Sequence, residues 1–375
     1  MDSAREAGVQ WSREEFHWDQ IEPERGLQDE AMLARYDAGV DGLRARGIRI
    51  LGLLAYRTPW SSGATAPDND EERQDYANFA AAMAARYRGR VDHWELWNEP
   101  NIERFWPPEP DAVSYAALAA AASTAIRGAN PDAKVFIGAV SGTDYAFIDQ
   151  IVDVSGPDVM DGISFHPYSG DTPWDRSDEL SDLNRLRYGL EQRGLDLPLW
   201  VTEIGFPSCD AGNGVEEHTQ AALLVRAYLS LYSQGVENVF LYDFVDDGTD
   251  PDETEMHFGL LLQYLQPKPS WTAFQWMTQM LAGSTFIESS SDGSVLLLRF
   301  EKPDGSVVLA AWDGCIGVHD RIMENARGTV ATFPASGAFY AHDLYGDLME
   351  MEQSGTEVSL QVGGAPCYII QEPEL

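Results

Sequence analysis

Short runs rich in β-branched and aromatic residues alternate with helical patterns through the first 245 residues of this chain. The runs begin 28 to 43 residues apart, and they are Val9–Phe16, Ile48–Ala55, Val91–Trp97, Lys134–Val140, Gly162–Phe165, Leu199–Ile204 and Asn238–Phe244. That spacing is the size of one strand–helix unit, and strands that are joined through helices pair in parallel. Seven or eight such units favour a closed (β/α)8 barrel, the TIM barrel, over an open sheet.

The segments between the runs carry their own helix signals. One apolar stripe at helical spacing is formed by Tyr76, Phe79, Ala80, Met83 and Tyr87. Several helical patterns end in Arg-Gly, as at 46–47, 88–89, 127–128 and 193–194. A glycine just past the last turn adopts the left-handed conformation at no steric cost, and an arginine in that turn suits the helix dipole. The fold class predicted for this part is therefore α/β.

The pattern changes after Gly283. Five short strands are predicted there, separated by Gly, Asp or Ser turns: Ser294–Lys302, Ser306–Asp313, Thr329–Pro334, Ala338–Leu344 and Val358–Gln361. Strands without intervening helices indicate a small antiparallel β-sandwich. We therefore expect a barrel domain over residues 1–283 and an accessory β-sandwich domain over residues 284–375.

The charge of the chain excludes some classes of partner. It has 25 basic and 61 acidic residues and a formal net charge of −36, yet 44% of its residues are hydrophobic, which is enough for a large core. Nucleic acids are bound through clustered Lys and Arg, so a nucleic-acid partner is not expected, nor is an anionic membrane surface. Only Lys134, Lys268 and Lys302 are lysines, so 22 of the basic residues are arginines. This composition has two interpretations: a GC-rich genome, since arginine codons are GC-rich, or adaptation to high salt, in which a dense carboxylate surface stays hydrated.

Cysteines and apolar runs give little information on the compartment. Cys209, Cys315 and Cys367 lie far apart, with neither a disulfide framework nor a zinc-binding pattern. There is no run of 18 apolar residues, so membrane insertion is not expected. The first eight residues lack the apolar core of a signal peptide.

Candidate catalytic residues follow from the barrel. Catalytic groups of such barrels lie at the C-terminal ends of the strands. Those ends carry Arg13, Asn98 with Glu99, His166, Glu203, and Tyr242 with Asp243. Two glutamates on different strands suit glycoside hydrolysis, in which one carboxyl group protonates the leaving oxygen and the other attacks or directs water.

Three of these strand ends resemble those of clan A glycoside hydrolases. The segment His93-Trp94-Glu95-Leu96-Trp97-Asn98-Glu99-Pro100-Asn101, followed by Phe105-Trp106, is similar to the acid/base strand of that clan. Leu199-Trp200-Val201-Thr202-Glu203-Ile204-Gly205 resembles its nucleophile strand, and Ile163-Ser164-Phe165-His166-Pro167-Tyr168 resembles the strand between them. Family 39 and related bacterial exopolysaccharide endoglycosidases look most similar, and the resemblance covers nearly the whole chain.

The resemblance implies a retaining β-glycosidase that acts by double displacement, with Glu99 as the acid/base and Glu203 as the nucleophile. Arg13 would hold Glu203 in its charged form, and Asn98 would bind a sugar hydroxyl group. His166, Tyr168 and Tyr242 would orient the carboxylates or the substrate. It also implies a carbohydrate substrate, no cofactor and no metal, and an extracellular or cell-envelope location. Trp18, Trp60, Trp97 and Trp106 would be available for stacking against sugar rings.

Alternatives remain open at this stage. The chain could be a catalytically weak or inactive carbohydrate-binding protein on a glycosidase scaffold. Arg13 could be an ion-paired residue of the barrel interior, and the tryptophans could pack in the core. The acidic loop 246–253 could bind calcium, but it lacks the ligand order of an EF-hand, so we interpret it as a solvated loop.

The position of the motifs along the chain departs from the family's pattern. In clan A the acid/base residue ends the fourth strand and the nucleophile ends the seventh, whereas here Glu99 ends the third visible run and Glu203 ends the sixth. We therefore expect the first visible strand to correspond to the second strand of the family. Residues 2–7 would then be the tail of the preceding helix, and the family's first strand would be missing from this chain.

Overall fold

The computed structural model describes residues 1–317, 329–334, 338–354 and 357–372. The chain divides into two compact units. The first contains Met1–Arg5, Val9–Pro167 and Ser181–Glu203, and the second contains Glu6–Gly8, Tyr168–Leu180 and Ile204–Leu375. These units are discontinuous in sequence, and the predicted domain boundary after residue 283 stays a prediction.

All seven strands predicted in the first 245 residues are confirmed. They form one sheet in which the spatial order is the chain order, and they are β1 (Trp11–His17), β2 (Arg49–Ala55), β3 (His93–Leu96), β4 (Lys134–Ser141), β5 (Gly162–His166), β6 (Leu199–Ile204) and β7 (Asn238–Leu241). The pairings from β1 through β6 are parallel. A sequential parallel order is that of a (β/α) barrel, so the predicted fold class is confirmed.

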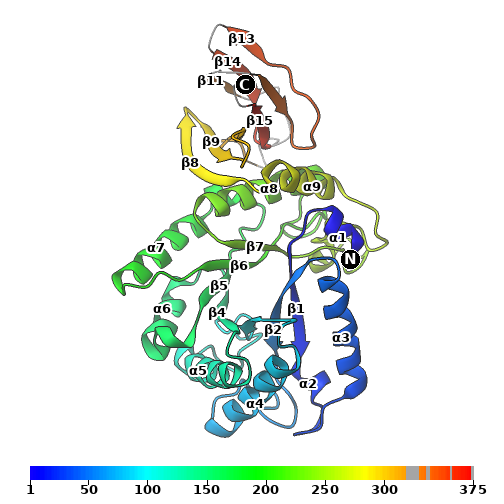
Figure 1. The fold of residues 1–375 in the computed structure, drawn as a ribbon, viewed down its shortest axis with the longest axis vertical. Coiled ribbons are helices and arrows are strands. Elements are labelled where there is room, and N and C mark those ends of the chain that lie inside the picture. The colour runs from blue at the N-terminus through cyan, green and yellow to red at the C-terminus, as the bar shows by residue number, and fades with distance from the viewer. Residues whose placement is uncertain (318–328, 335–337, 355–356, 373–375) are drawn as a thin grey trace. The chain divides into compact units, whose positions relative to one another are not determined.

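Helices connect the strands of the first unit. They are α1 (Asp2–Glu6), α2 (Trp18–Ile21), α3 (Glu30–Arg44), α4 (Asp70–Arg86), α5 (Ala112–Ala129), α6 (Tyr145–Ser155), the 3-10 turn η1 (Pro157–Val159) and α7 (Asp178–Gln192). In Figure 1, α3 to α6 lie around the outside of strands β1 to β5. Asp29, Asn69 and Asp111 cap α3, α4 and α5, each accepting two backbone N–H groups. Among the described residues, no helix has the length and apolar character needed to cross a membrane.

The two faces of β1 meet different surroundings. Trp11 packs in the barrel interior against side chains of β3 and β6, with its ring centroid 4.8 Å from that of His93 and 5.0 Å from that of Trp200. Phe16 packs outward against Tyr36 of α3, 4.9 Å away between centroids. Since side chains alternate along a strand, Arg13, Glu15 and His17 share the inward face with Trp11.

The second unit contains an antiparallel β-sandwich. Its larger sheet has the order β12-β15-β10-β9-β8, and its smaller sheet has the order β11-β14-β13. The strands are β8 (Thr285–Asp292), β9 (Val295–Glu301), β10 (Val307–Asp313), β11 (Thr329–Pro334), β12 (Phe339–His342), β13 (Glu352–Ser354), β14 (Glu357–Val362) and β15 (Cys367–Gln371). Val295 and Ala311 of one sheet share a buried cluster with Phe333 and Leu360 of the other. The predicted sandwich is confirmed, although β8, β13 and β15 were not predicted.

The remaining elements of the second unit are α8 (Glu217–Ser233), α9 (Pro269–Leu281) and the 3-10 turns η2 (Trp174–Arg176) and η3 (Thr254–His257). The α9 helix begins at Pro269, a proline at the first helical position. Lys268, the residue before α9, is buried. Its ammonium group donates hydrogen bonds to Asp246 at 2.6 Å and to Ser208 at 2.9 Å. One end of the acidic loop 246–253 is thus neutralised by a lysine.

Candidate active site

The chain turns sharply after β3 and brings two polar side chains to the strand end. Trp97 and Glu99 both have positive φ angles, 67° and 44°, which non-glycine residues rarely adopt and which cost of order 1–3 kcal/mol each. Backbone hydrogen bonds hold this turn, from Trp97 N to Leu54 O and from Glu99 N to Ala139 O. Asn98 and Glu99 lie within it and are largely buried, 4% and 9% exposed.

Arg13 joins three acceptors at the ends of two further strands. Its Nε donates to Glu95 Oε2 at 2.5 Å, its Nη2 donates to Asn98 Oδ1 at 2.8 Å, and its Nη1 donates to Glu203 Oε1. Burial alone would lower the pKa of Arg13, but the Glu95 and Glu203 carboxylates outweigh burial and raise it. The guanidinium therefore stays charged, and its positive charge favours the ionised form of Glu203.

His166 links the two candidate catalytic glutamates. Its Nδ1 lies 3.0 Å from Glu99 Oε1 and 3.8 Å from Glu203 Oε2, while its Nε2 lies 3.1 Å from Thr202 Oγ1. The ring is fully buried. Contacts on both nitrogens fix the ring plane, so Glu99 meets a histidine of defined orientation.

The two glutamates face each other closely. One carboxylate oxygen of Glu99, one of Glu203 and a nitrogen of His166 all lie within 4.8 Å of one another. Such a set could also hold a metal ion. However, the Arg13 guanidinium already contacts Glu203, so the site has a fixed positive charge that opposes a second cation. The electrostatics favour proton and nucleophile chemistry, and the expected absence of a metal stays a prediction.

Two predicted tryptophans lie in the core. Trp18, in α2, is fully buried, donates its Nε1–H to Glu22 and stacks on Phe79 at 5.6 Å between centroids. Trp106 is 2% exposed and packs edge-on against Trp97, which is itself fully buried. None of the three rings has an exposed face that could stack on a sugar. These tryptophans pack in the core.

Tyr168 and Tyr242 occupy the second unit. Their ring centroids are 6.3 Å apart, and both rings pack edge-on against Phe258, at 6.1 and 5.3 Å. Tyr242 directly follows β7, and Tyr168 lies two residues after β5. They form one aromatic cluster, and their roles towards substrate stay predictions.

Several site residues were not predicted from the sequence. Glu95 is fully buried and shares Arg13 with Glu203, and Thr202 contacts the far nitrogen of His166. Thr202 directly precedes the predicted Glu203, and Glu95 lies four residues before the predicted Glu99. Tyr56 was also missed; it follows β2 and donates its hydroxyl to Glu15 at 3.0 Å.

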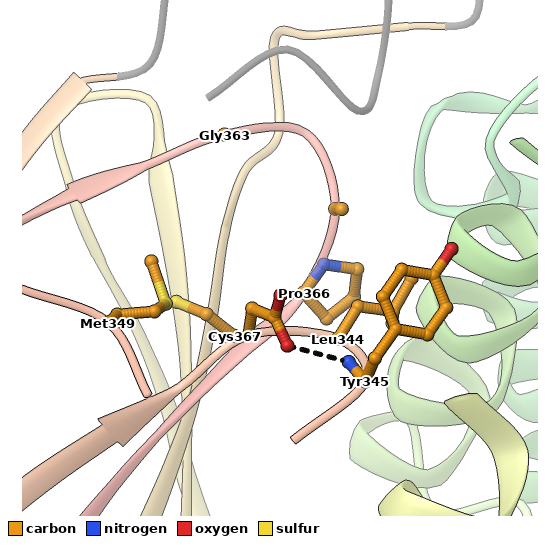
Figure 2. A pocket seen from close by; sticks show the side chains of 8 residues that line it. Leu344, Tyr345, Met349, Gly363, Pro366 and Cys367 are labelled. Carbon is orange, nitrogen blue, oxygen red and sulfur yellow. Dashed lines mark hydrogen bonds between the residues drawn. The ribbon is translucent and has the colours of Figure 1, made fainter. Parts of the chain in front are cut away.

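A small pocket in the β-sandwich does not offer comparable chemistry. Figure 2 shows Leu344, Tyr345, Met349 and Cys367 lining it. Its carboxylate, Asp343, accepts the backbone N–H of Tyr345 at 2.9 Å, and burial raises the pKa of the Cys367 thiol to about 12. The Asp343 carboxylate is already hydrogen-bonded, and the Cys367 thiol stays protonated. Unlike the barrel site, the described residues that line this pocket include no pair of facing carboxylates.

Sequence comparison decides the family. Residues 1–236 match the family described as cellulase (glycosyl hydrolase family 5). The chain belongs to this glycoside hydrolase family. The match covers more than half of the chain and includes both Glu99 and Glu203, and the predicted resemblance to clan A glycoside hydrolases is confirmed.

Similar proteins also include family 39 enzymes. The structure of a family 39 glycoside hydrolase from Bacteroides cellulosilyticus WH2 superposes with a TM-score of 0.82 and 28% identity, over 99% of this chain and 77% of that one. A family 39 β-xylosidase from Caulobacter crescentus has a TM-score of 0.68 and 18% identity, over 99% of this chain and 91% of that one, and so shows the fold alone. A β-xylosidase of Geobacillus stearothermophilus is 24% identical over 294 residues, which are 72% of this chain but only 55% of that relative.

Proposed function

We propose that this protein is a retaining glycoside hydrolase that cleaves β-glycosidic bonds, with Glu99 as the acid/base and Glu203 as the nucleophile. The observation that carries the proposal is the approach of the two carboxylates, whose oxygens lie within 4.8 Å. Retaining enzymes place their carboxyl groups about 5–5.5 Å apart, whereas inverting enzymes need about 6.5–9.5 Å to admit a water molecule between them.

The geometry supports two displacements in sequence. In the first, Glu203 attacks the anomeric carbon while Glu99 gives its proton to the leaving oxygen; the glycosidic C–O bond breaks and an ester bond to Glu203 forms. In the second, Glu99 takes a proton from water, which attacks the same carbon and releases Glu203. One residue therefore serves as acid and then as base.

The neighbours of the glutamates suit these roles. Arg13 keeps Glu203 ionised before attack and stabilises it again when it leaves. Arg13 also engages Asn98 Oδ1, which fixes the side-chain amide so that its nitrogen is the donor offered to a sugar hydroxyl. His166 orients Glu99 through the 3.0 Å contact. Arg13 and His166 act as positioning residues in this account.

The substrate is proposed from the relatives. Because two of them are named β-xylosidases, aryl β-xylosides are the first substrates to test, followed by β-glucosides and polysaccharides. Residues 284–375 are proposed as an accessory domain of the barrel. The net charge of −36 leads us to propose retained activity in molar salt, where self-repulsion is screened.

Replacing the nucleophile tests the proposal. Glu203→Ala should lower kcat on an aryl β-glycoside by about 10⁴-fold or more, and added azide should restore part of the rate and give an α-glycosyl azide. Glu191→Ala, which removes an exposed glutamate of α7, serves as the control with unchanged activity. Full activity of Glu203→Ala would contradict the proposal, and sugar binding without turnover by the wild type would favour the carbohydrate-binding alternative.

A further inference from the structure

The inward face of β1 continues beyond Arg13 towards the mouth of the barrel. Glu15 is two residues further along, about 7 Å from Arg13 at the usual strand rise, and His17 follows at the next inward position. The side chains beyond Arg13 are more exposed than Arg13 itself, 39% for Glu15 and 31% for His17 against 9% for Arg13. Glu15 therefore lies beside the catalytic carboxylates at a point that solvent and substrate can reach.

Glu15 is held as a carboxylate by two donors. Its Oε1 accepts the Tyr56 hydroxyl at 3.0 Å, and its Oε2 lies 2.9 Å from His17 Nε2. Burial raises the pKa of Glu15, but the hydrogen bonds from His17 and Tyr56 outweigh burial and lower it, with help from the Arg13 charge. A carboxylate oxygen has two lone-pair sites, so each oxygen can accept one further hydrogen bond.

Tyr56 connects Glu15 to the turn that carries Glu99. Its ring stacks on Phe105 at 5.5 Å between centroids and packs edge-on against Trp97 at 6.4 Å. Burial, followed by the Glu15 charge, raises the pKa of Tyr56, so its hydroxyl stays a donor. These contacts fix Glu15 without using up its capacity to accept.

From this arrangement we propose that Glu15 is a specificity-determining residue that accepts hydrogen bonds from the hydroxyl groups of a sugar ring at the glutamate pair, and that its charge excludes uronic acids. The proposal rests on the proposed glycosidase function. A neutral pyranose offers vicinal hydroxyl donors to the two open lone pairs, whereas a uronate would bring a second carboxylate against Glu15.

The nearby cations do not favour a uronate. Arg13 is engaged by Glu95, Asn98 and Glu203. Arg104 lies over the Phe105 ring at 5.2 Å, but it is exposed, and an exposed charge acts weakly through water. His17 is paired with Glu15 at 2.9 Å, so neither it nor Arg13 is available to bind a uronate.

The test compares two neighbouring glutamates. Glu15→Gln removes the charge but keeps the shape, and Glu14→Gln makes the same change on the outward face, where Glu14 accepts the Ser12 hydroxyl at 2.5 Å. We expect wild type to cleave an aryl β-xyloside or β-glucoside at least 100-fold faster in kcat/KM than the aryl β-glucuronide. Glu15→Gln should lower kcat/KM on the neutral substrate by about 10–100-fold and narrow the preference at least tenfold, and Glu14→Gln should change neither.

A binding measurement separates this proposal from the proposed function. In Glu203→Ala, which cannot turn over, calorimetric titration with the neutral glycoside and the glucuronide should show the same preference, and adding Glu15→Gln should weaken neutral binding. The proposed role of Glu15 would be overturned if wild type and Glu15→Gln preferred the neutral glycoside over the glucuronide by the same factor. It would also be overturned if wild type preferred the glucuronide. If the wild type never cleaves a glycoside but Glu15→Gln still weakens sugar binding, the role of Glu15 in binding is supported and the glycosidase function is rejected.

Discussion

Arg13, whose side chain is only 9% exposed, and Arg226, which is fully buried, lie one in each unit and bind different kinds of partner. Arg13 contacts side chains, Glu95, Glu203 and Asn98, and Glu203 is 15% exposed. Arg226 in α8 is fully buried; it binds Asp175 of η2 at 2.7 and 3.1 Å and the backbone carbonyls of Ile316 and Gly364. In the first arrangement the Glu203 carboxylate stays partly exposed, and in the second the arginine joins a helix, a 3-10 turn and the β-sandwich.

Burial of an arginine therefore does not by itself indicate function. A buried ion pair is weak evidence for net stability, yet breaking one is costly because the remaining charge is left alone. What separates the two is the exposure of the carboxylate that each arginine binds, which is 15% for Glu203 and 6% for Asp175. Asp175 also accepts the Trp312 indole N–H at 3.3 Å, so its capacity is used within the fold.

The largest effect is expected in the second unit. Arg226→Met leaves Asp175 buried without its cation and should lower the free energy of unfolding by about 3–5 kcal/mol. Thermal denaturation measures the loss, and kcat/KM per folded molecule should stay within twofold of wild type. The double variant Arg226→Met/Asp175→Leu should recover much of the stability, since apolar replacement of a whole pair is often neutral. A large fall in kcat/KM with intact stability would contradict a purely structural role for Arg226.

The next largest effect concerns Arg13. Arg13→Met should lower kcat/KM by about 10²–10³-fold and move the acidic limb of its pH profile upward, because without the guanidinium the protonated form of the Glu203 carboxyl is favoured. Arg13→Lys is the matched variant: it keeps the charge but cannot make three directed contacts, so it should recover only part of the rate. A purely structural role would lower stability and leave the pH profile unmoved.

A smaller effect is expected at a carboxylate that lacks an arginine. Asp243 follows β7, its Oδ1 is buried without a hydrogen-bond partner among the described residues, and burial, with Asp247 and Asp246, raises its pKa to about 7. The folded state therefore holds a proton that the unfolded state has lost, and the contribution of Asp243 to stability falls as pH rises from about 4 to about 7. Asp243→Asn should remove this decline, so its melting temperature should gain on wild type between pH 4 and 8. A constant difference between the two across that range would contradict the assignment.

The sequence predicted the barrel well because its signals are local. Each strand is a short apolar run with a helix after it, and all seven runs became strands. The strands of the sandwich were harder to predict from the sequence. β8 is a polar, mostly exposed strand containing Glu288 and three serines, so it lacks the alternation that marks a half-buried strand, and β13 has only three residues. Strands of this kind are held by their neighbours in the sheet.

The site was predictable only in part. Glu99, Glu203 and Asn98 were predicted because they end strands within recognisable motifs. The structure places Arg13 in contact with Asn98 and Glu203, and His166 in contact with Glu99. Trp18 and Trp106 were assigned to sugar contacts because composition does not reveal which aromatic rings keep an exposed face. Side chains alternate along β1, so Glu15 and His17 share the inward face of that strand with the predicted Arg13. This alternation was the signal that could have found them.

The stereochemistry of hydrolysis is the most direct test of double displacement by Glu203 and Glu99. Wild type would be mixed with an aryl β-xyloside, or with the best aryl β-glycoside found, and the first-formed sugar followed by proton NMR before it mutarotates. Two displacements by Glu203 and then water predict that the β-anomer appears first. First appearance of the α-anomer would mean a single displacement, and it would contradict the assignment of Glu203 as a nucleophile.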